Sequence, residues 1–215
     1  MATTETKEAF QESSPVANEV LTAIKERRTV RFYDQNKEIP KDLLLKVIEA
    51  GHFAPSAKNL QPWHFVVITN PAMIDKVMSA KLLTRPEGDS LKNYRGEDIE
   101  AWIPKAFIVV FFEKTKSVLA DKRYHAANSE EIPQVSNYSL TDIMSIGCSL
   151  QNMSLAAHSL GLGSCICGDV LLPGINPEIY SWLNVDREKY DLMCGLKIGW
   201  PRKIREPIDE KVRFE

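Results

Sequence analysis

The chain has 215 residues and a mass of 24.3 kDa, a length that predicts a single domain. With 44% hydrophobic and 26% charged residues, it has the composition of an ordinary globular protein, which excludes disordered, collagen-like and disulfide-scaffold classes. The 27 Lys and Arg residues nearly balance the 29 Asp and Glu residues, so we expect neither a nucleic-acid partner nor attachment to a membrane.

Cysteine usage and the first residues indicate a cytoplasmic protein. The four cysteines are irregularly spaced, which argues against a disulfide framework. Residues 1–14 contain three glutamates and no apolar stretch, so we expect a flexible tail there rather than a targeting peptide. Residues 143–168 lack Asp, Glu, Lys and Arg, but polar side chains such as Gln151 and Asn152 interrupt them too often for a membrane span.

The first half of the chain predicts helices and a strand in alternation. Apolar residues repeat at helical spacing over residues 14–24 and end at a basic cluster, residues 25–31. A second helix is expected between the prolines at 40 and 55, because its apolar residues form one face. The aromatic and β-branched residues 63–68 predict a buried strand, and residues 70–78 predict a short helix capped by Asn-Pro.

The second half predicts a flap, two strands and two helices. Residues 81–103 are polar and contain glycines, which indicates a flap or variable insertion. Residues 106–112 are all apolar, as in a central strand covered on both faces, and residues 192–198 predict a last strand. A capping box opens a long helix at residues 139–160, and its apolar residues outside one stripe indicate burial by its own domain or by a partner subunit. A short helix follows Pro177.

Three segments are candidates for chemistry. The first, Arg27-Arg28-Thr29-Val30-Arg31, carries three guanidinium groups that suit a phosphate, and an extended backbone would place Arg27, Thr29 and Arg31 on one face. The alternative is a solvated basic end that complements the dipole of the first helix. A second basic group, residues 202–205, has the same two interpretations.

The second candidate is the loop at residues 54–63, where small residues and amide side chains lie between two prolines. Such a loop can bring backbone groups, Asn59 and Gln61 close to the edge of a planar polar ligand. The alternative is a simple connection from helix to strand, with Trp63 in the core.

The third candidate, residues 161–169, contains glycines but matches neither a P-loop nor a G-x-G-x-x-G dinucleotide fingerprint. On a strand, Cys165 and Cys167 would share a face, and we interpret them as small buried thiols. No histidine lies at a metal-ligand spacing, so no metal is expected, and a zinc protein built on these cysteines is the weakest alternative. No nucleophile motif is present either, so no catalytic side chain is predicted.

Taken together, these segments resemble the FMN-dependent nitroreductase family over about residues 20–207. The resemblance rests on the order and spacing of five motifs, which are Arg27-Arg28-Thr29-Val30-Arg31, Pro55-Ser56-Ala57 with Asn59-Leu60-Gln61-Pro62-Trp63, Gly161-Leu162-Gly163, Cys167-Gly168 and Gly199-Trp200-Pro201. It implies an α+β fold with a mixed central sheet sandwiched by helices. It also implies one FMN-binding domain at residues 15–215, in an intertwined homodimer with FMN at the subunit interface.

The same resemblance implies roles for individual residues. The FMN phosphate and ribityl chain would be held by Arg27, Arg28, Thr29, Lys203 and Arg205. Arg31 would lie near the pyrimidine edge of the flavin, where a cation stabilises the reduced ring. The partner subunit would contribute Pro55, Ser56, Ala57 and Asn59, and Gln61 would also contact the cofactor. The Gly168 N–H would face the flavin N5, beside Cys167, which stands where many relatives have an acidic residue.

The implied function is a ping-pong oxidoreductase that passes electrons from NADH or NADPH through bound FMN to a nitroaromatic, a quinone or a similar small acceptor. Two alternatives use the same fold. One is other flavin chemistry, such as reductive dehalogenation or flavin reduction. The other is a catalytically silent, flavin-binding dimer.

Overall fold

The centre of the fold is a four-stranded sheet. The structure is a computed structural model that describes residues 15–79, 103–120, 134–135, 138–168 and 177–202. The sheet consists, in spatial order, of β1 (Trp63–Ile68), β2 (Ala106–Glu113), β6 (Tyr190–Gly199) and β5 (Gly163–Cys167). All three neighbouring pairs are antiparallel, and a parallel pairing occurs at an isolated bridge between Thr29 and Ser164. A separate hairpin joins β3 (Gln134–Val135) to β4 (Tyr138–Ser139).

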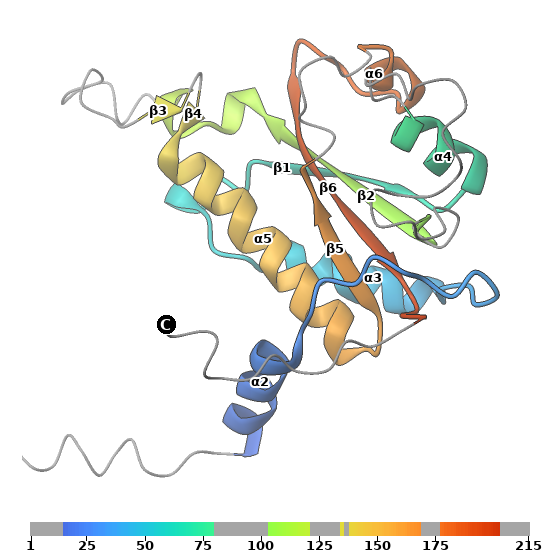
Figure 1. Cartoon of the computed structure of the whole chain (residues 1–215). Helices are drawn as coiled ribbons and strands as arrows, with labels where there is room; N and C mark the ends of the chain where they lie inside the picture. The colour runs from blue at the N-terminus through green and yellow to red at the C-terminus, as the bar shows by residue number, and fades with distance from the viewer. Residues whose placement is uncertain (1–14, 80–102, 121–133, 136–137, 169–176, 203–215) are drawn as a thin grey trace, which may run out of the picture.

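Helices cover both faces of this sheet (Figure 1). One face lies under α3 (Lys41–His52) and α5 (Leu140–Ser159), and the other under α4 (Pro71–Ser79) and α6 (Ile179–Trp182). The remaining helix, α2 (Pro15–Glu26), precedes the sheet and lies near the C-terminal end of α5. This arrangement confirms the predicted α+β fold, with a sheet sandwiched by helices.

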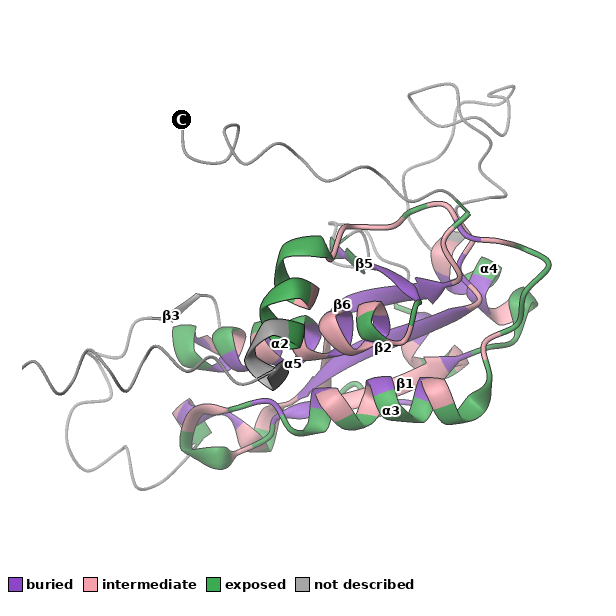
Figure 2. Cartoon of the chain, turned by 90° about the horizontal axis from the view of Figure 1, so that it is seen from below, coloured by how far each residue is buried: buried purple, intermediate pink, exposed green. Residues whose placement is uncertain are grey.

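Strand β2 shows why the sequence predicts a central strand. Its residues from Ala106 to Phe112 are fully buried, and Figure 2 shows the buried colour concentrated on β2, β6 and β5. Alternate side chains enter the two cores: Ile108, Val110 and Phe112 join α3 and α5, whereas Phe107, Val109 and Phe111 join α4 and α6. A strand covered on both faces needs apolar residues at every position, which explains the unbroken run.

Helix α5 begins at the predicted capping box. The Ser139 hydroxyl accepts a hydrogen bond from the Asp142 backbone N–H (3.1 Å), and the Asp142 carboxylate accepts one from the Ser139 N–H (3.2 Å). Further along, α5 approaches α3 closely, because a Cβ on Gly51 would lie 2.8 Å from the Met153 Cγ. Among the described helices, none is both long and apolar enough to cross a lipid bilayer.

Two differences from the predicted elements are informative. Strand β5 was not predicted, because its sequence, Gly-Ser-Cys-Ile-Cys, has little intrinsic strand preference and forms a strand by pairing with β6. The helix predicted after Pro177 begins at Ile179. The predicted tail at residues 1–14 and residues 81–102 of the expected flap lie outside the described residues.

Two buried serines of α5 give a matched test of hydrogen bonding in the core. The Ser149 hydroxyl donates to the Gly51 carbonyl (3.0 Å), whereas the Ser154 hydroxyl has no partner in the described part of the chain. Ser149→Ala should therefore lower the free energy of unfolding by about 0.5–1.5 kcal/mol. Ser154→Ala should leave it unchanged or raise it by up to about 1 kcal/mol, because it removes an unsatisfied hydroxyl. Urea unfolding of both variants would show this order, and the reverse order would contradict it.

Candidate functional site

The basic segment after α2 lies as an extended chain along the start of β5. The Val30 N–H donates to the Ser164 carbonyl (2.9 Å), next to the bridge between Thr29 and Ser164. The Val30 side chain occupies the space that a Cβ on Gly163 would need, since that atom would lie 2.6 Å from the Val30 Cβ. Because side chains alternate along an extended chain, Thr29 and Arg31 leave the backbone on the side opposite Val30. We call Arg27, Arg28, Thr29 and Arg31 the anion clamp.

A pocket of about 140 Å³ lies against this clamp. It is lined by Glu26, Arg27, Arg28, Thr29, Val30, Arg31, Phe32, His158, Gly161, Leu162, Gly163, Ser164 and Pro201. The first and third candidate segments of the sequence therefore meet in one pocket. His158 was not among the predicted residues, although its position in the last turn of α5, three residues before Gly161, is a signal that could have indicated it.

Arg28 combines a structural role with an unused donor. Its Nη1 donates to the carbonyls of Lys25 and Arg27 (2.5 and 3.0 Å), so this nitrogen caps the C-terminal end of α2. Its Nε is buried and has no hydrogen-bond partner within the described ranges. A buried guanidinium N–H is costly to leave unpaired, and a phosphate oxygen would satisfy it. The residues present therefore fit an anion.

The loop after Pro55 holds an unusual backbone conformation. Lys58, Asn59 and Gln61 have φ values of 55°, 55° and 48°, in the left-handed region that non-glycine residues rarely adopt. The Gln61 N–H donates to the Ser56 hydroxyl (3.0 Å), which helps to hold the loop in this shape. Strain of this kind clusters at functional sites, because a relaxed loop would place its groups elsewhere.

This loop lies far from the anion clamp within one chain. The Ala57 N–H donates to the hydroxyl of Ser145 (3.0 Å), in the N-terminal half of α5, whereas the clamp's pocket contains His158 from its last turn. Thirteen residues of helix separate these two positions, about 20 Å at 1.5 Å per residue. A single chain therefore does not bring the first and second candidate segments together. Trp63 is buried, so the core role proposed for it is confirmed.

The cysteine segment has the predicted alternation. Cys165 and Cys167 are both buried on one face of β5, and Ile166 between them is exposed. Burial raises the pKa of the nearby Cys194 thiol, on β6, to about 12. All four cysteines lie in the described residues and none forms a disulfide, and those residues contain no cluster of His, Cys, Asp or Glu that could hold a metal. Gly168 is exposed, with open space where a Cβ would be.

The predicted contributions of Lys203 and Arg205 lie outside the described residues. The chain that leads to them passes the clamp, since the Arg202 N–H donates to the Phe32 carbonyl (3.0 Å). Their role stays a prediction.

Comparison with known proteins identifies relatives of this chain. A model of the nitroreductase family matches residues 24–200. A protein of Methanothermobacter thermautotrophicus, provisionally named an NADH dehydrogenase/NAD(P)H nitroreductase, is 34% identical over 152 residues, which are 70% of this chain and 61% of that protein. An iodotyrosine deiodinase of Haliscomenobacter hydrossis is 26% identical over 63% of this chain and 60% of its own length. The matches thus span about three fifths of these two relatives.

Solved structures share the fold. The crystal structure of a nitroreductase with bound FMN from Bacteroides fragilis aligns with a TM-score of 0.64, covering 92% of this chain and 98% of that one. At 24% sequence identity, this similarity concerns the fold alone.

Proposed function

We propose that this chain, which belongs to the nitroreductase family, is an FMN-dependent oxidoreductase of the cytoplasm. It takes electrons from NADH or NADPH and passes them, in a ping-pong reaction, to a nitroaromatic, a quinone or a similar acceptor. The observation that carries the proposal is the pocket walled by the anion clamp, which includes Arg28, whose buried Nε finds no acceptor among the residues that the structure describes. FMN, when bound, would supply the hydride and electron transfer.

The chain's own residues bind and tune the cofactor in this proposal. Arg27, Arg28 and Thr29 would hold the phosphate, because all three residues line one pocket and carry hydrogen-bond donors. Arg31 is exposed and permanently charged, so it would favour negative charge on the reduced flavin ring. No side chain needs to act as a nucleophile.

A homodimer would complete the site. The loop at residues 55–61 lies beside the N-terminal half of α5, and the anion clamp lies beside its C-terminal end. Two α5 helices that pack antiparallel across a two-fold axis would bring the loop of one subunit to the clamp of the other. Exposed apolar side chains support such an interface: Met144 on α5 is 66% exposed, and Val20, Leu21 and Ile24 on α2 are about half exposed.

Met144→Asp tests this dimer. A charge in the centre of an apolar interface must be desolvated, so the dimer should dissociate at least about tenfold more readily. Sedimentation equilibrium of the variant measures the dissociation constant, and flavin content should fall with the dimer fraction. Ser181→Asp on α6, an exposed position on the opposite layer, is the control and should leave the dimer intact. An unchanged dimer in the Met144 variant would argue against α5 as the interface.

The proposed activity is tested by the visible spectrum of the purified protein. The flavin absorption band should be present, or appear after FMN is added, and should bleach when NADH or NADPH is added without oxygen. Later addition of a nitroaromatic or a quinone should restore the oxidised band. A protein that does not bind FMN would refute the proposal, and one that binds FMN but is not reduced would support the catalytically silent alternative.

Reductive dehalogenation is the second candidate, because one relative is an iodotyrosine deiodinase. Iodide release from iodotyrosine by the reduced protein, without reduction of nitroaromatics, would favour this activity over nitroreduction.

A further inference from the structure

The segment from Val30 to Asp34 is fixed to two strands of the sheet. The Val30 N–H donates to the Ser164 carbonyl of β5 (2.9 Å), and the Asp34 N–H donates to the Trp200 carbonyl just after β6 (2.8 Å). The backbone of the anion clamp is thus the first part of a longer strip of chain that crosses the end of the sheet. Contacts that hold the far end of this strip, near Asp34, therefore also influence the position of the clamp backbone.

Tyr33 links the far end of the strip to the clamp. Its side chain is fully buried, and its ring takes the space of a Cβ on Gly199, which would lie 2.6 Å from the Tyr33 Cδ1. Its hydroxyl donates to the Val30 carbonyl (2.7 Å). Burial raises the pKa of Tyr33 well above its usual value, so the hydroxyl stays a donor at neutral pH. Because Val30 lies between Thr29 and Arg31, this bond restrains the backbone segment from which both clamp side chains emerge.

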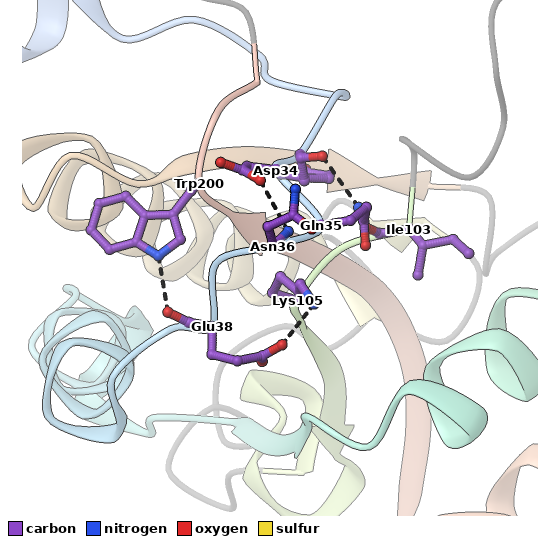
Figure 3. Close-up of polar contacts among 8 residues, drawn as sticks. Asp34, Gln35, Asn36, Glu38, Ile103, Lys105 and Trp200 are labelled. Atoms are coloured by element: carbon purple, nitrogen blue, oxygen red, sulfur yellow. Dashed lines mark hydrogen bonds and ion pairs between the residues drawn. The ribbon is translucent and has the colours of Figure 1, made fainter.

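Gln35 in turn holds Tyr33 from the outside of the protein. Its side-chain amide donates to the carbonyls of Tyr33 (3.2 Å) and Ile103 (2.9 Å), the latter just before β2. Figure 3 shows Gln35 reaching Ile103, beside the ion pair between Lys105 and Glu38 (2.7 Å). Residues 35 and 36 form an exposed polar turn. Such turns are ordinarily mobile, but this one is hydrogen-bonded to a segment 68 residues away in the sequence.

The same turn is also bonded to the end of β6. The Trp200 indole N–H donates to the Glu38 carbonyl (3.0 Å), as Figure 3 shows, and the Asp34 carboxylate accepts a bond from the Asn36 N–H (3.0 Å). Hydrogen bonds therefore run in series from Ile103 through Gln35, Tyr33 and Val30 to Ser164. The clamp backbone lies at the end of this series.

We propose that Tyr33 and Gln35 are positioning residues for the anion clamp, acting through the Val30 peptide to aim Thr29 at a phosphate group. The inference rests on the proposed function, because it takes the FMN phosphate as the clamp's ligand. Neither side chain needs to touch the flavin. Loss of either one should weaken recognition of the phosphate and leave recognition of the ring system unchanged.

Comparison of FMN with riboflavin, which lacks the phosphate, tests the inference directly. Fluorescence titration of the flavin-free, full-length protein gives both dissociation constants. Tyr33→Phe keeps the ring and removes only the hydroxyl, and Gln35→Ala removes an exposed amide without disturbing the core. Each should weaken FMN binding about three- to tenfold, the range expected for one hydrogen bond, and change riboflavin binding less than about twofold. The ³¹P resonance of bound FMN should shift in the Tyr33 variant.

Two controls separate positioning from a general loss of stability. Asn36→Ala, beside Gln35 in the same exposed turn, should leave both affinities unchanged. Ile74→Val shortens a buried side chain on α4, so it should lower the unfolding temperature without changing the ratio of FMN to riboflavin affinity.

The possible results distinguish the inference from the proposed function. If the wild type prefers FMN and that preference is unchanged in both the Tyr33 and Gln35 variants, the positioning role is overturned and the proposed function stands. If the wild type binds FMN and riboflavin equally, the clamp does not recognise phosphate, and the inference is likewise overturned. If the wild type binds neither flavin, the proposed function itself is refuted and the inference with it.

Discussion

Replacement of Gly163 by alanine is expected to weaken FMN binding by more than about tenfold. The added Cβ would lie 2.6 Å from both the Cβ and the Cγ1 of Val30. Rotation of the valine side chain cannot relieve contact with its own Cβ, so the backbone must move away from β5. That movement breaks the bond from the Val30 N–H to Ser164 and displaces the clamp. Overpacking of this kind usually costs about 1–3 kcal/mol. Here the displaced segment carries the clamp, so the overpacking should weaken FMN binding.

A second substitution provides the control. In the double variant Gly163→Ala/Val30→Gly, the Cβ atom is moved from one side of the contact to the other, so the strip can lie on β5 again. FMN affinity, measured by fluorescence titration, should recover at least partly, although the added glycine makes the segment more flexible. If Gly163→Ala alone binds FMN as tightly as the wild type, the close contact with Val30 does not set the position of the clamp.

The contact between Val30 and Gly163 also shows which features of the site cannot be predicted from the sequence. Strand β2 and helix α5 were predictable because each carries a local signal: an unbroken apolar run and a capping box followed by a helical stripe. Local patterns also predicted three candidate segments. That two of them share a pocket depends on contacts across more than 130 residues, which no local pattern encodes. The family resemblance, and not periodicity, predicted that they belong together.

Two other features could not be predicted for different physical reasons. Lys58 and Gln61 adopt left-handed backbone conformations that their residue types disfavour, so only the surrounding structure can impose them. The helical stripe of α2 was predicted correctly, yet Val20 and Ile24 are about half exposed. Periodicity indicates which face of a helix is apolar, but not whether the same chain or a partner covers it.

Replacement of Asp142 by alanine should lower the free energy of unfolding by about 3–5 kcal/mol, the largest loss expected among the substitutions proposed for this protein. This carboxylate is 1% exposed, and it accepts hydrogen bonds from the Ser117 hydroxyl (2.6 Å) and from the backbone N–H groups of Val118 (2.9 Å) and Ser139 (3.2 Å). Alanine would leave both N–H groups buried without an acceptor, at about 1–3 kcal/mol each, and would remove the carboxylate half of the capping box of α5. Urea unfolding measures the loss.

Asp142→Asn refines this prediction, because asparagine has nearly the same shape. The oxygens of Asp142 accept from Val118 on one side and from Ser139 on the other, so an amide in either orientation points its NH₂ group at one backbone N–H. Of the two bonds from backbone N–H groups, one is kept and the other is replaced by the repulsion of two donors, so the loss should lie between zero and that of alanine. Asp42→Ala, an exposed acid in the first turn of α3, is the matched control and should cost less than about 1 kcal/mol. Equal losses for Asp142→Ala and Asp42→Ala would mean that the helix dipole, and not the buried bonds, accounts for the role of Asp142.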